Sequence, residues 1–188
     1  MDPRSRDSLT VISPENAAYP APVRRRLGDA APNLTARGNL DLLALPKTAI
    51  FCSARCPGNA ILAAYDEATK LRDSGRCVIG GFHSPIEKDC LRILLRGKQP
   101  IIICPARAIE TMRVPADCRA AFDAGRILFL SPFVDAPKRV TREAALRRNI
   151  LVAALADDAY IAHVAPGGQT DETLTVLSNW LVPTRTNE

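Results

Sequence analysis

Side chains that hold metals or stack on bases are scarce in this sequence. Its 188 residues include two histidines and one tryptophan, and aromatic side chains make up 5%. No two cysteines have the C-x-x-C spacing of structural zinc sites, so we expect no metal site. The scarcity of aromatic residues also makes base stacking less evident than in typical single-strand binding proteins.

Long apolar runs are absent as well. None approaches the roughly 18 residues that a membrane-spanning helix needs, and the first residues are too polar for a secretory signal. We therefore expect a cytoplasmic protein with no membrane partner. The sequence has neither a G-x-G-x-x-G fingerprint nor a Walker loop, so no standard nucleotide motif applies and we expect no cofactor.

What the sequence does contain is a moderate excess of positive charge. The formal net charge is +5, most of the cations are arginines, and clusters lie at 24–26 and 147–148. Arginine forks suit bidentate contacts with phosphate, so a polyanionic partner is compatible with this composition. With 47% hydrophobic residues the chain has enough apolar surface for a core without disulfides, and we expect its six cysteines to be reduced.

Apolar runs of strand length alternate with helical patterns from residue 48 onward. The strands are expected at 48–53, 76–81, 100–105, 126–133 and 159–165, each followed by a helical pattern. The helix at 84–97 has the clearest start, with Ser84 as N-cap, Pro85 first and Glu87 completing a capping box. Thr141 and Thr170 are expected to cap two later helices. This alternation predicts a Rossmann-like, doubly wound α/β fold, a mainly parallel sheet with helices on both faces.

The flanking segments show weaker patterns. Residues 1–18 are expected to be a flexible N-terminal segment, 19–180 a single domain and 181–188 a polar tail. Within the early part of the domain, PAPVRRRL predicts a short helix. NLTARGNLDLLALP predicts an extended piece, a turn at Gly38-Asn39 and another short helix.

The candidate site residues follow strands or lie on neighbouring helices. In a doubly wound sheet, ligands bind beyond the carboxyl ends of the strands, and a helix N-terminus that follows glycines can hold a phosphate. The same diglycines are also typical of tight turns, and Arg148 is also typical of a solvated helix face. The candidates for binding phosphate or nucleic acid are Ser53, Ala54, Arg55, Gly80, Gly81, Phe82, His83, Ser84, Arg148, Asn149, Pro166, Gly167, Gly168, Gln169 and Thr170.

Four motifs, in this order, resemble the DNA-processing protein A (DprA, or Smf) family. IFCSAR is similar to the family's strand ending in Gly-Ser-Arg, which places Arg55 at the arginine. VIGGFHSPIEKDCLRIL is similar to Ser-Gly-x-Ala-x-Gly-Ile-Asp, with Glu87 at the aspartate. RRNILVAAL resembles Arg-Asn-Arg-Ile-Ile-Ala-Gly-Leu, with Arg148 and Asn149 matching and Ile150 replacing the second arginine. PGGQTDET falls where the family has Ser-Gly-Ser.

The resemblance implies a binding protein without established catalysis. It implies binding of single-stranded DNA or of a nucleotide phosphate, a role in DNA processing or recombination, and a RecA-type recombinase as a partner. A homodimer is also compatible with it.

Two further functions stay open. IFCS and PGGQTDE are also similar to motifs of the LOG phosphoribohydrolase family, formerly called lysine-decarboxylase-like. That resemblance implies cleavage of nucleoside monophosphates, with Arg148 and Glu172 as catalytic residues. A nucleotide sensor without turnover would use the same pocket.

Overall fold

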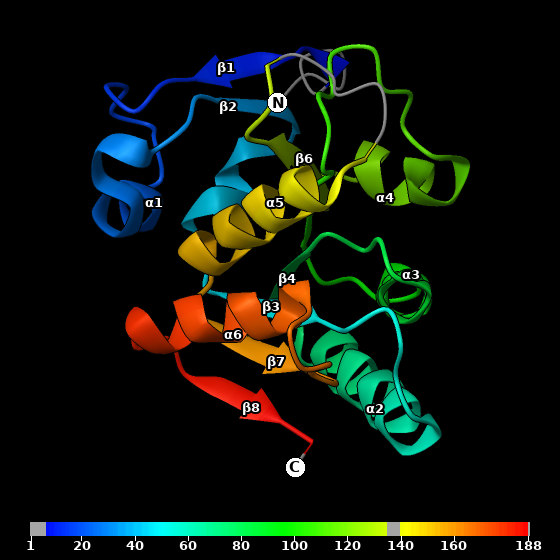
Figure 1. The fold of residues 1–188 in the computed structure, drawn as a ribbon. Helices are drawn as coiled ribbons and strands as arrows, with labels where there is room; N and C mark the ends of the chain where they lie inside the picture. The colour runs from blue at the N-terminus through cyan, green and yellow to red at the C-terminus, as the bar shows by residue number, and fades with distance from the viewer. Residues whose placement is uncertain (1–6, 135–139, 188) are drawn as a thin grey trace.

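A central sheet between two layers of helices organises the molecule (Figure 1). The computed structural model describes residues 7–134 and 140–187. Within these ranges the sheet has eight strands in the order β1-β2-β6-β5-β4-β3-β7-β8. They are β1 (Thr10–Ile12), β2 (Leu34–Gly38), β3 (Lys47–Phe51), β4 (Cys77–Gly80), β5 (Ile101–Ile103), β6 (Ile127–Ser131), β7 (Asp158–Ile161) and β8 (Thr184–Thr186).

The sheet is doubly wound around β3. From β3 the chain proceeds outward through β4 and β5 to β6, all parallel, and then returns to β7 on the other side of β3. Only the pairings of β2 with β1 and with β6 are antiparallel within the described ranges. The predicted Rossmann-like, mainly parallel sheet is confirmed. Its reversal of winding puts the carboxyl ends of β3, β4 and β7 side by side, which is where such folds hold ligands.

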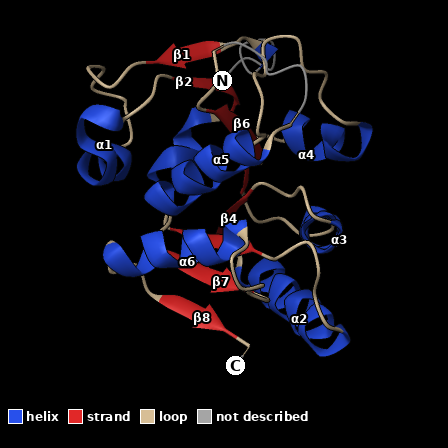
Figure 2. Ribbon diagram, viewed as in Figure 1, coloured by secondary structure: helices blue, strands red, loops and turns tan. Residues whose placement is uncertain are grey.

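Helices cover both faces of the sheet (Figure 2). On one face lie α1 (Ala21–Leu27), α5 (Arg142–Leu155) and α6 (Gln169–Asn179); on the other lie α2 (Gly58–Ser74), α3 (Pro85–Leu95) and α4 (Arg119–Asp123). Short 3-10 turns lie between α1 and β2 at η2 (Gly28–Ala30), between β2 and β3 at η3 (Leu40–Ala44) and before α4 at η4 (Ala116–Cys118). None of the helices in the described parts of the chain is long and apolar enough to cross a bilayer.

Strand side chains alternate between the two cores. In β6, Leu128 and Leu130 pack beneath α1, α5 and α6, whereas Ile127 and Phe129 pack beneath the other helices. This is the two-residue period of a strand buried on both sides. Burial of each such side chain contributes about 1.5–3 kcal/mol to folding, so the strand ends rest on a firmly packed base.

The two edges of the sheet differ from the sequence expectation. Thr10–Ile12, expected to have no regular structure, forms β1 and pairs with β2. Thr184–Thr186, expected to be a plain polar tail, forms β8 and pairs with β7. Three residues are too few to show the alternating pattern of a strand. These two strands form because the neighbouring strand supplies their hydrogen bonds. The domain limits at 19 and 180 stay a prediction.

Candidate anion-binding site at the strand ends

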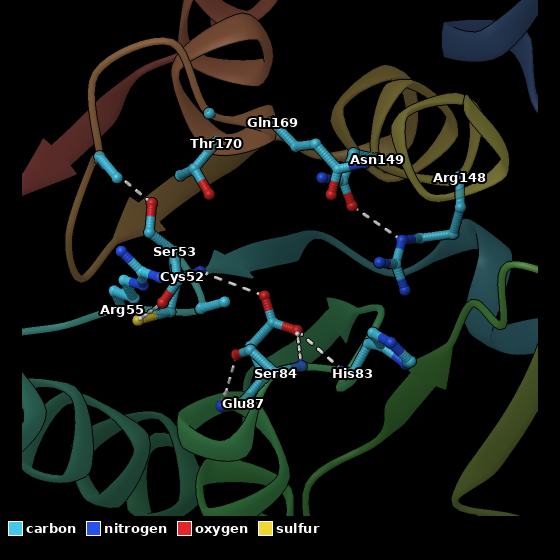
Figure 3. A pocket seen from close by; sticks show the side chains of 13 residues that line it. Cys52, Ser53, Arg55, His83, Ser84, Glu87, Arg148, Asn149, Gln169 and Thr170 are labelled. Atoms are coloured by element: carbon cyan, nitrogen blue, oxygen red, sulfur yellow. Dashed lines mark hydrogen bonds between the residues drawn. The ribbon is translucent and has the colours of Figure 1, made fainter. Parts of the chain in front are cut away.

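A cavity of about 330 Å³ lies beyond the carboxyl ends of β3, β4 and β7 (Figure 3). It joins four stretches that are far apart in the sequence. They are the residues after β3, the start of α3, the middle of α5 and the loop into α6. The lining residues are Cys52, Ser53, Ala54, Arg55, His83, Ser84, Glu87, Arg148, Asn149, Ala165, Gly168, Gln169 and Thr170.

The guanidinium of Arg148 is the most buried charge in this pocket. Only 4% of the residue is exposed, and burial lowers the pKa of the guanidinium, an effect that nearby Glu87 partly opposes. Its Nε donates to Asn149 Oδ1 at 2.7 Å and its Nη1 donates to the Cys104 carbonyl at 3.2 Å. No described carboxylate forms an ion pair with it. A desolvated cation held in this way is stabilised by an incoming anion.

Gly81 makes room for that guanidinium. A Cβ atom at this position would lie 1.6 Å from Arg148 Nη1 and 2.0 Å from Arg148 Cζ. Any side chain at 81 would therefore displace the arginine. The second glycine of the Gly80-Gly81 pair allows a close approach between α5 and the end of β4, so it is more than a turn residue.

The N-terminus of α6 faces the same pocket. Gly168 is the N-cap, without a side-chain cap, and the amides of Gln169 and Thr170 have no hydrogen-bond partner among the described residues. Gly167 adopts a φ of 69°, and its amide donates to Asp171 Oδ2 at 2.9 Å. The expectation that Thr170 caps the helix is wrong, because α6 begins at Gln169, two residues earlier than that cap would place it, and Thr170 lies in its first turn. Unpaired amides at a helix start attract anions.

Glu87 occupies the amides at the start of α3. Its carboxylate accepts hydrogen bonds from the backbone N–H groups of Cys52 at 3.1 Å, His83 at 2.9 Å and Ser84 at 3.2 Å (Figure 3). The predicted capping box between Ser84 and Glu87 is present, and Thr141 caps α5 as expected. Because His83 and Ser84 donate within the protein, their amides are not free to hold phosphate as the sequence suggested. The same carboxylate ties the end of β3 to the end of β4.

We expect Glu87→Gln to lower the free energy of unfolding by roughly 2 kcal/mol. A glutamine keeps one acceptor oxygen but turns an NH2 donor toward backbone donors, so at least one amide loses its partner. Urea unfolding followed by circular dichroism measures the change. Glu110→Gln, which removes the same charge from an exposed position, is the control and should change stability by less than about 0.5 kcal/mol. Equal effects of the two variants would contradict this role of Glu87.

Three other predicted residues take different places at the rim. Arg55 is exposed, and its guanidinium has no partner among the described residues. Asn149 orients Arg148 and donates from Nδ2 to Thr173 Oγ1 at 3.4 Å, which links α5 to α6. Ser53 is buried, and its Oγ accepts a hydrogen bond from the Ala165 amide at 2.9 Å. Of the three, Arg55 alone offers a free charge to a ligand.

Several predicted residues lie outside the pocket. Gly80 is the last residue of β4, and Gly81, Gly167 and Pro166 do not line the cavity. Phe82 is 5% exposed, packs into the core with a φ of 48° and does not line this cavity. The lining residues that the site prediction omitted are Cys52, Glu87 and Ala165. Of these only Glu87 carried a signal in the sequence, its place in the capping box.

Glu172 also stays outside the cavity. Its Oε1 pairs with Arg142 Nη2 at 2.5 Å at the start of α5. The acid–base residue of the hydrolase alternative therefore does not share the pocket with Arg148.

Comparison with known proteins identifies the family. The model of the family described as DNA recombination-mediator protein A matches residues 10–170. The chain belongs to this family. The match starts at the first residue of β1 and ends in the first turn of α6. It confirms the resemblance of the sequence to the DprA family. No curated protein matches the sequence.

Solved structures of family members have the same fold. DNA processing protein A from Streptococcus pneumoniae is 18% identical, with a TM-score of 0.77 over 97% of this chain and 64% of that chain. The protein from Helicobacter pylori, described for its single-stranded DNA binding mode, is 18% identical, with a TM-score of 0.72 over 97% of this chain and 81% of that one. A molybdenum cofactor binding protein from Rippkaea orientalis is 10% identical, with a TM-score of 0.53 over 76% of each chain. This family member thus spans about two thirds of the pneumococcal protein.

Proposed function

We propose that this protein binds single-stranded DNA by holding backbone phosphates in the strand-end pocket. The observation that carries the proposal is Arg148, a buried guanidinium without a carboxylate partner among the described residues. The family match and the DNA-binding mode named for the Helicobacter pylori protein support the choice of ligand. A role in DNA processing or recombination follows from the same support.

The pocket offers two phosphate positions of different character. At the inner one, Arg148 and the free amides of Gln169 and Thr170 supply donors in a desolvated setting, where charge-assisted hydrogen bonds are strongest. At the outer one, Arg55 supplies a solvated charge at the mouth. Glu87 contributes to the framework, since its oxygens already accept three backbone hydrogen bonds.

Salt dependence tests the proposal directly. If two phosphates are neutralised, the logarithm of the binding constant should fall with the logarithm of salt concentration with a slope of about −1.4, or about −0.7 for each phosphate. Fluorescence anisotropy with a labelled oligonucleotide measures it. Arg55→Ala should reduce the slope by about 0.7. Lys70→Ala, an exposed cation near the far end of α2, is the control and should leave the slope unchanged. A salt-independent signal, or none at low salt, would reject the proposal.

Two other ligands remain outcomes of the test. Release of free base from purine monophosphates would establish the phosphoribohydrolase instead, although Glu172 lies outside the pocket. A nucleotide that binds but is not converted would identify the protein as a sensor. Such a nucleotide, present at 100 times its Kd, should stabilise the protein by about 2.7 kcal/mol.

We also propose a RecA-type recombinase as a partner, to be tested by co-purification. We further propose a homodimer, to be tested by light scattering.

A further inference from the structure

Two thiols lie together on the loop that carries Arg55. Cys52 follows β3 and lines the pocket, and Cys56 is half-buried four residues later. The chain bends at Ala54 and Arg55, between the two cysteines. Cys52 belongs to the small apolar cluster beneath the pocket, and Cys56 packs against the same cluster.

We propose that Cys52 and Cys56 form a reversible disulfide that weakens ligand binding in the pocket. The modification site itself rests on the two thiols and the bend between them. Its regulatory effect rests on the proposed binding of DNA phosphates. The closed ring would contain Ser53, Ala54 and Arg55, all of which line the cavity. The guanidinium that is free in the reduced protein would then be attached to a constrained backbone.

The two thiols have different parts in the reaction. Burial raises the pKa of the Cys52 thiol, so it stays protonated, whereas half-buried Cys56 is open to a small oxidant. With hydrogen peroxide, the Cys56 thiolate attacks one oxygen; an S–O bond forms, the O–O bond breaks and hydroxide leaves. The Cys52 sulfur then attacks the Cys56 sulfur; the S–S bond forms, the S–O bond breaks and water leaves with the thiol proton. Two thiols are oxidised and one peroxide is reduced to water.

The hydrogen bond of the Cys52 sulfur does not prevent this change. In the reduced protein, Cys52 Sγ donates to the Ser53 carbonyl at 3.4 Å, a weak bond that can be given up. Cys90 packs in the same cluster and donates to the Ala64 carbonyl, so it is the competing partner. The other three cysteines belong to separate core clusters.

Peptide mapping tests the disulfide. The full chain is treated with hydrogen peroxide, free thiols are alkylated, and the protein is digested with trypsin. Since trypsin cleaves after Arg55, a Cys52–Cys56 bond joins two peptides that dithiothreitol separates. We expect this linked pair in the natural sequence and in Cys90→Ala, and its absence in Cys56→Ser. A Cys52–Cys90 pair, or alkylation of both Cys52 and Cys56 after oxidation, would overturn the proposal.

Oligonucleotide binding tests the regulation. Oxidation should weaken binding about fivefold, the size expected when one charged contact is weakened, and dithiothreitol should restore it. Cys56 does not line the pocket. The Cys56→Ser variant should therefore bind the oligonucleotide like the reduced protein, both before and after peroxide treatment. Unchanged or tighter binding by the linked protein would contradict the switch. Failure of the reduced protein to bind at all would contradict the proposed function instead, because the mapping result is independent of it.

Discussion

Arg148→Ala is expected to weaken binding of single-stranded DNA about 30-fold, or roughly 2 kcal/mol. The variant removes the one buried cation of the pocket, whose hydrogen bonds to phosphate are strengthened by desolvation. Anisotropy at low salt measures the loss. The slope of the salt dependence should also fall by about 0.7 in magnitude, because one phosphate contact is gone.

Stability separates this role from a structural one. Relief of the buried charge should offset the two hydrogen bonds that Arg148 makes to Asn149 and Cys104, so the unfolding free energy should stay within about 1 kcal/mol of its original value. The matched control is Arg147→Ala, the exposed neighbour that contacts the Phe133 ring at 5.3 Å. It should change affinity less than threefold, as is usual for an exposed cation. Equal losses of affinity in the two variants would mean that Arg148 contributes to binding only through the net charge of the protein.

The central sheet was predictable because its signals are local. Strands β3 to β7 are continuous apolar runs, and the helices between them carry their own caps, Ser84 and Thr141 among them. Alternation of such elements leaves few arrangements other than a parallel sheet between helices. The edges were not predictable, since β1 and β8 are ordered by hydrogen bonds from neighbouring strands and not by a pattern of their own.

The site was predictable as a set of segments but not as a set of contacts. Strand ends and glycine loops bring Arg55, Arg148 and the start of α6 to one pocket. The burial of Arg148, however, depends on α5 crossing over Gly81, which lies 67 residues earlier in the chain. The pattern around Arg148 fits an exposed helix face equally well.

Two expectations differ from the structure because the features that decide them are not visible in the local sequence pattern. Phe82 was taken for a rim aromatic, but a positive φ turns it into the core, and no local pattern signals such a conformation outside glycine. The amides of His83 and Ser84 were expected to be free, and the local cap was correctly predicted. The Cys52 amide, which follows β3, donates a hydrogen bond to the Glu87 carboxylate and helps to hold it in place.

Gly81→Ala should weaken binding of single-stranded DNA by most of the roughly 30-fold loss expected for Arg148→Ala. It does so without altering the charge of the protein. The new methyl group would occupy the space of Arg148 Nη1, so the guanidinium must leave its place beside Cys104. Backbone strain does not explain the loss, since Gly81 is not among the residues with positive φ. Gly28→Ala, at a φ of 53° with open space around the added atom, is the control; it should cost about 1 kcal/mol of stability and leave affinity unchanged.

The double variant of Gly81 and Arg148 decides whether the two losses share one cause. When Arg148 is already alanine, the methyl group at 81 has no guanidinium to displace, so Gly81→Ala should add no further loss of affinity. The two single effects would then be strongly non-additive, as expected for residues in direct contact. Additive losses would mean that Gly81 acts on the ligand by another route, and the close approach of β4 and α5 would not be what positions the phosphate-binding arginine.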